Sequence, residues 1–169
     1  HYSVRQIASK GQEGKEMIFG DKHLFAIEGE FIEVYGKWTY GRIRFWHCDT
    51  PFGDFDDTSD IASSSRWGRT FLKHTSERSR PDLEGMSSRD LYEFLYGRFI
   101  VPIHGAHNKP YPTVEWIRRP YVIEDIGESA LRDDYAVLVV RRADGFDRLI
   151  IMDFEKDEVT EGLMPPGYC

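Results

Sequence analysis

The chain has 169 residues, 40% of them hydrophobic and 14% aromatic, which suits one domain with a packed core. Its 22 basic and 29 acidic residues give a net charge of −7, the wrong sign for nucleic-acid phosphates or anionic membrane surfaces. No run approaches the roughly 18 apolar residues that a spanning helix needs. The composition therefore argues against nucleic-acid and membrane partners and favours a basic protein as the complement.

Residues 1–16 differ in character from the rest. They are rich in Gly, Gln and Lys and lack the apolar centre of a signal peptide, whereas strong apolar patterning starts at Met17. We therefore expect residues 1–16 to be a leader or an appended segment and residues 17–169 to form one cytoplasmic domain.

Two strands are predicted next. Apolar residues fall at even spacing over 24–35, and the alternation returns in "GRIRFWHC", residues 41–48. Turn residues bound the stretch between them, so the two strands are predicted to form a hairpin with Trp38 and Tyr40 in its turn.

Two helices are expected after this hairpin. The first covers about 59–73, with Asp57 or Thr58 as its N-cap and Asp60 near the positive end of the helix dipole. The second covers 89–99 and is capped by one of the serines that precede it.

The last third reads mostly as strands. Residues 113–117 and 121–125 are strand-like, and 154–162 can supply a short final strand. The runs 135–140 and 148–152 bracket Asp144-Gly145, a hairpin signal whose usual turn has positive φ at both central residues. Both runs are apolar on two faces, so they belong in the centre with helices covering at least one side. The fold class predicted is α+β, an antiparallel, mostly meandering sheet with two helices inserted after the first hairpin.

Common catalytic motifs are missing from the sequence: it has no P-loop, no dinucleotide-binding glycine pattern and no nucleophile elbow. Cys48 follows His47, but adjacent strand residues point to opposite faces, so we expect a buried structural thiol. His104 and His107 are spaced like metal ligands, yet Gly105 and Ala106 lie between them in a proline-rich loop. We expect these histidines to be packed locally, with no metal and no cofactor.

Four aspartates lie in "PFGDFDDTSD", residues 51–60. A calcium loop that starts at Asp54 would fail at three later positions, namely Thr58, Ser59 and Ser65, so the stretch is not an EF-hand site. Helix capping accounts for Asp57 and Asp60. Asp54 and Asp56, two residues apart in an extended approach, would project together as an anionic patch.

Three passages carry a resemblance to a known family, namely "MIFGDKHLFAIEGEF", "YGRIRFWHCDTPFGDFDDTSDIA" and "IEDIGESALRDDYAVLVVRRADGFDRLII". Together they resemble the bacterial immunity protein 42 family from Met17 nearly to the end. The resemblance implies a small cytosolic protein that binds a cognate secreted toxin tightly and blocks it without catalysis. The family defines no catalytic residues to carry over.

The partner-facing residues are therefore predicted from the chemistry of this sequence. An acidic inhibitor can occupy a basic toxin cleft, and aromatic anchors add binding energy. The predicted contacts are Asp54, Asp56, Asp57, Asp60, Trp38, Tyr40 and Tyr111. Two alternatives remain: a hydrolase that reverses a toxin modification around His104 and His107, and a chaperone-like adaptor. The sequence does not set the oligomeric state.

Overall fold

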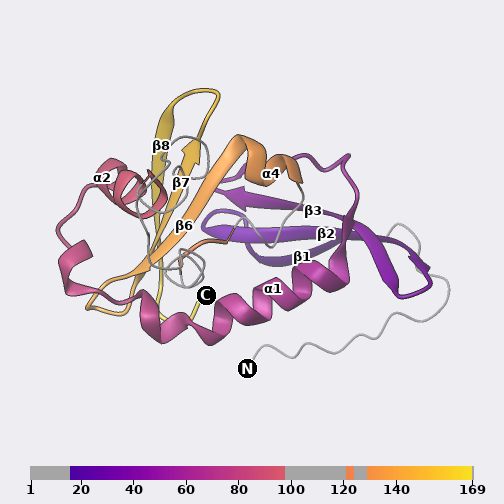
Figure 1. Cartoon of the computed structure of the whole chain (residues 1–169), viewed down its shortest axis with the longest axis horizontal. Coiled ribbons are helices and arrows are strands. Elements are labelled where there is room, and N and C mark those ends of the chain that lie inside the picture. The colour runs from indigo at the N-terminus through magenta and orange to yellow at the C-terminus, as the bar shows by residue number, and fades with distance from the viewer. Residues whose placement is uncertain (1–15, 98–120, 124–128, 169) are drawn as a thin grey trace, which may run out of the picture.

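The structure is a computed structural model that describes residues 16–97, 121–123 and 129–168. Its strands form two antiparallel sheets rather than one (Figure 1). The α+β class is confirmed, and so are the helices that follow the first hairpin. The division into two sheets was not predicted.

The first sheet has five strands in the order β1-β2-β3-β4, with β5 also paired to β3. Its members are β1 (Glu16–Asp21), β2 (Phe25–Tyr35), β3 (Trp38–His47), β4 (Thr50–Phe52) and β5 (Ser59–Asp60). β4 and β5 pair with different parts of β3: Phe45 lies opposite Phe52, and Tyr40 lies opposite Asp60.

The second sheet has the order β6-β7-β8. Its members are β6 (Tyr135–Arg141), β7 (Asp147–Asp153) and β8 (Glu158–Met164). Residues 121–123 lie beside β6, where the Ile123 amide donates to the Val137 carbonyl at 3.0 Å. Of the predicted strand at 121–125, the described part forms only an isolated bridge, between Val122 and Leu138, and not a strand. Residues 113–117 lie outside the described residues.

The helical elements follow in sequence. They are α1 (Ile61–Lys73), η1 (Thr75–Arg78), η2 (Pro81–Leu83), α2 (Ser88–Tyr92), η3 (Glu93–Gly97) and α4 (Ser129–Asp134). α1 matches the first predicted helix closely, whereas the second begins as α2 and continues as the π-helical turn η3.

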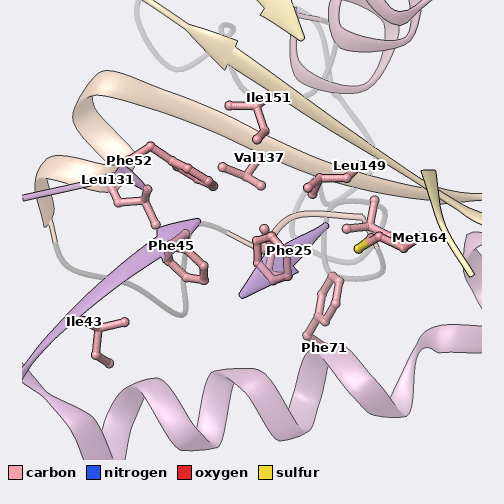
Figure 2. Packing of buried hydrophobic residues seen from close by; sticks show 12 residues of the cluster. Phe25, Ile43, Phe45, Phe52, Phe71, Leu131, Val137, Leu149, Ile151 and Met164 are labelled. Atoms are coloured by element: carbon pink, nitrogen blue, oxygen red, sulfur yellow. The ribbon is translucent and has the colours of Figure 1, made fainter. Parts of the chain in front are cut away.

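The main core lies between the two sheets (Figure 2). Rings of the first sheet stack on the side that faces this core, with centroids 5.6 Å apart for Phe25 and Phe45 and 5.7 Å apart for Phe45 and Phe52. Phe52 in turn meets Tyr135 of β6 at 5.7 Å. α1 contributes Phe71 to this core, and in Figure 2 this side chain points from the helix toward Phe25.

The other face of the second sheet has a core of its own. Leu138 and Ile150 pack there against Leu91 of α2 and Leu95 of η3. β6 and β7 are therefore buried on both faces, as their apolar runs predicted.

Two hairpin turns differ from expectation. The turn between β2 and β3 is only Gly36-Lys37, with φ of +59° at Gly36, so Trp38 and Tyr40 lie in β3 and not in the turn. In the hairpin between β6 and β7, Gly145 has a φ of +86° but Asp144 does not have positive φ. The Arg142 amide donates to the Phe146 carbonyl at 2.8 Å, so the loop has three residues and ends on a left-handed glycine.

Truncation of two phenylalanines of the first sheet is expected to lower stability by very different amounts. Phe45 is 1% exposed and Phe19 is 54% exposed. We expect Phe45→Ala to lower the free energy of unfolding by about 3–5 kcal/mol because it opens a cavity between the sheets. Phe19→Ala, the matched control, should cost less than about 1 kcal/mol. Denaturant titration measures both, and similar costs would contradict this account of the core.

Candidate functional site

The acidic turn, residues 54–57, joins β4 to β5. Asp54 and Asp56 are exposed, and Asp57 is half-buried. The Asp54 carboxylate accepts the Asp56 amide at 2.8 Å, and Asp57 accepts the Thr58 amide at 2.8 Å. Such bonds from aspartate to the nearby backbone stabilise a tight turn. The sequence between the strands thus holds two exposed carboxylates in a fixed local geometry.

Asp60, rather than Asp57 or Thr58, caps helix α1. Its carboxylate accepts the Ala62 amide at 3.2 Å and the Thr39 amide of β3 at 3.3 Å. The Ser63 hydroxyl, followed by these backbone amides, holds the pKa of Asp60 below its ordinary value. The expected cap position was wrong because the short strand β5 forms before the helix begins. Asp60 therefore has a structural role.

A shallow pocket of about 330 Å³ lies where the β2–β3 hairpin meets α1. We call it the tip pocket; it is lined by Lys37, Trp38, Asp60, Ala62, Arg66 and Arg69. Two of the predicted contact residues, Trp38 and Asp60, meet here. The sequence reasoning missed the three cations around them. Arg66 and Arg69 lie three residues apart in a helix and thus on one face, a signal that the sequence contained.

The face of β3 that points away from the core carries charged and aromatic side chains. Along β3, core residues alternate with residues on this outer face, which include Tyr40, Arg42, Arg44 and Trp46. Arg42 pairs with Glu30 of β2 at 2.8 Å. Tyr40 is half-buried in this row, close to the tip pocket along the strand.

Glu28 anchors the same face. Its side chain is only 2% exposed and accepts from Arg44 Nε at 2.6 Å and from Trp46 Nε1 at 2.5 Å. Lys22 Nζ lies 3.7 Å from the same carboxylate and 3.6 Å from the centroid of the Trp46 ring. Burial on its own would raise the pKa of Glu28, but the hydrogen bonds from Arg44 and Trp46 outweigh it and the pKa is lowered.

Cys48 is exposed in a turn and not buried in a strand. Cys48 and Asp49 both have positive φ, +49° and +61°, which makes a two-residue turn between β3 and β4. Because the strand has ended, the thiol lies 3.5 Å from His47 Nε2, contrary to the expectation that the two could not meet. His47 Nδ1 donates to the Leu24 carbonyl at 2.7 Å, so Nε2 is left to accept from the thiol.

Three residues from the sequence analysis, Tyr111, His104 and His107, lie outside the described residues. Within the described ranges, no group of three or more His, Cys, Asp or Glu side chains is arranged to hold a metal ion. None of the described helices is long and apolar enough to cross a membrane.

The lowered pKa of Glu28 predicts that replacing this residue costs stability in a pH-dependent way. Because the folded pKa lies below the ordinary value of 4.5, Glu28 stabilises the fold above that pH and loses this effect as pH falls through the folded pKa. We expect Glu28→Gln to cost about 3 kcal/mol at pH 7, because two cations lose their partner. Thermal unfolding from pH 7 to pH 3 should show the variant and the wild type converging in acid.

Glu30→Gln is the matched control, since Glu30 lies on the same strand and receives one hydrogen bond, from Arg42. It should cost about 1 kcal/mol or less at pH 7. A Glu28→Gln cost that stays constant with pH would contradict the role given to the carboxylate charge.

Comparisons with known proteins agree with this fold. The family model described as "Immunity protein 42" matches residues 17–169. The crystal structure of CdiI from Burkholderia dolosa AUO158 is similar, with a TM-score of 0.65 over 90% of this chain and 92% of that one. The two sequences are 19% identical, so this likeness supports the fold alone. A search of curated proteins finds no match. Because the family match spans most of its length, the chain belongs to the immunity protein 42 family, whose members neutralise toxins.

Proposed function

We propose that this immunity protein neutralises its toxin by stoichiometric binding and that the acidic turn is part of the binding surface. The observation that carries the proposal is the exposure of Asp54 and Asp56, which project from a turn fixed by its own hydrogen bonds. A pre-formed turn loses little conformational freedom on binding, which favours tight association.

The partner proposed is a toxin domain with a basic surface, met in the cytoplasm. The chain carries a net charge of −7, and close charge pairs across an interface can contribute about 1.5–7 kcal/mol. Asp57 is half-buried and Asp60 is the helix cap, so Asp54 and Asp56 are the stronger candidates for direct contact.

Aromatic anchors are proposed beside these charges. Trp38 is 40% exposed at the hairpin tip, and Tyr40 lies two residues along the same strand. Trp and Tyr are enriched among the residues that dominate binding energy. Tyr111 stays a proposal from sequence.

A binding titration against the toxin domain encoded next to this gene tests the mode of action. We expect one tight site with a stoichiometry near one, and the same result for the His104→Ala/His107→Ala variant. Preserved cell protection without any binding would instead favour the hydrolase. Weak binding to many unrelated proteins would favour the adaptor.

Charge reversal tests the acidic turn. We expect Asp54→Lys/Asp56→Lys to weaken toxin binding by about tenfold or more, since two attractive contacts become repulsive. The association rate of the wild type should also fall between about 0.05 and 0.5 M salt as the Debye length shrinks. Surface plasmon resonance measures both quantities.

Glu155→Lys/Glu158→Lys is the control for net charge. These two glutamates are exposed at the turn between β7 and β8, on the other sheet, and the variant changes the total charge by the same amount. If both double variants weaken binding equally, the acidic turn has no specific role.

A further inference from the structure

The tip pocket carries the opposite charge to the rest of the chain. Three of its six lining residues are cations, Lys37, Arg66 and Arg69, and one, Asp60, is an anion. The pocket is thus locally positive in a protein whose net charge is −7. This local positive charge is complementary to an anionic group of a partner.

The cations are only partly satisfied by the protein itself. Arg66 donates to Ser63 Oγ at 2.8 Å, and its nearest carboxylate oxygen, on Asp60, is 4.0 Å away. Lys37 Nζ lies over the Trp38 ring, 4.9 Å from its centroid. In the described part of the chain, the Arg69 guanidinium has no hydrogen bond and no ion pair. The pocket therefore offers donors to a ligand without breaking internal contacts.

Asp60 does not neutralise these groups fully, because it supplies one negative charge against three cations and its Oδ1 already accepts two backbone amides. The carboxylate accepts the amides of Ala62 and Thr39 and thereby fixes the helix start to β3. The helix N-terminus is therefore not available as an anion site, because the carboxylate of Asp60 already accepts from the Ala62 amide there. Recognition in the pocket thus rests on cationic side chains beside the ring of Trp38, and a side chain that carries a carboxylate on an aliphatic stem matches both.

We propose that the tip pocket receives an acidic side chain of the toxin, an aspartate or glutamate. Its carboxylate would bind Arg69 and Lys37, and its aliphatic stem would pack on Trp38. Charged hydrogen bonds from arginine to a carboxylate are among the strongest that side chains form. This inference rests on the proposed binding of a toxin and adds a second contact whose sign is opposite to that of the acidic turn.

Helix α1 provides a matched control for a test of Arg69. Arg69 and Lys73 are both exposed on this helix, and Lys73 does not line the pocket. We expect Arg69→Glu to weaken binding of the toxin domain about tenfold or more and Lys73→Glu to weaken it less than about threefold. Equal effects would mean that only the change in net charge matters, and they would overturn the proposed role of the pocket.

Carbodiimide coupling identifies the occupant directly, because this reagent joins a carboxylate to a nearby amine. In the complex we expect a cross-link between Lys37 and an aspartate or glutamate of the toxin. Lys37→Arg keeps the charge and should keep the affinity while abolishing that cross-link. A stoichiometric complex whose cross-links never include Lys37 would overturn the inference and leave the proposed function standing. Failure of the wild type to bind at all would overturn both.

Discussion

The row of rings that crosses from one sheet to the other sets the frame for everything else in the molecule. It consists of Phe25, Phe45, Phe52 and Tyr135. Because side chains of a strand alternate between faces, a β3 that gives Phe45 to this row has to turn Arg44 and Trp46 the other way. The outer face of the first sheet is thus a direct consequence of how the two sheets are joined.

Close backbone packing then places the helix that forms the tip pocket. A Cβ on Gly41 would lie 2.0 Å from Ile61 Cδ1 and 2.3 Å from the Glu30 carbonyl oxygen, so only glycine lets α1 start this close to β3. Asp60 fixes the same junction through hydrogen bonds to both elements. With the helix start held there, Arg66 and Arg69 come to line a pocket with Trp38.

Periodicity predicted the elements that have one buried face, and it failed where burial gives no pattern. The β2–β3 hairpin and α1 follow from alternation and spacing in the sequence. The β6–β7 hairpin, whose strands are buried on both faces, was predicted instead from its apolar runs and from Asp144-Gly145. β1 was missed because all six of its residues are exposed, so no face stands out. The position of Asp60 as the cap and the exposed turn at Cys48 depend on the pairing of short strands, which local sequence does not encode. Of the candidate site, the structure shows only that two residues named from the sequence, Trp38 and Asp60, line one pocket, and their role in binding stays a prediction. The cations beside them come from a helix whose placement needs the tertiary structure.

The net charge of this protein sets its long-range electrostatic field, whereas recognition of a partner depends on where individual positive and negative side chains lie on the surface. Asp56 and Asp60 are four residues apart, so their Cα atoms lie within about 14 Å of each other. An anionic turn and a cationic pocket therefore lie within one small area of the surface. Only a partner that presents a base and an acid at the matching separation satisfies both, because a uniformly basic surface would leave Arg69 opposite like charge. If both proposed contacts form, a uniformly basic toxin is repelled by the pocket as well as attracted by the acidic turn, and the pocket then adds specificity to the binding.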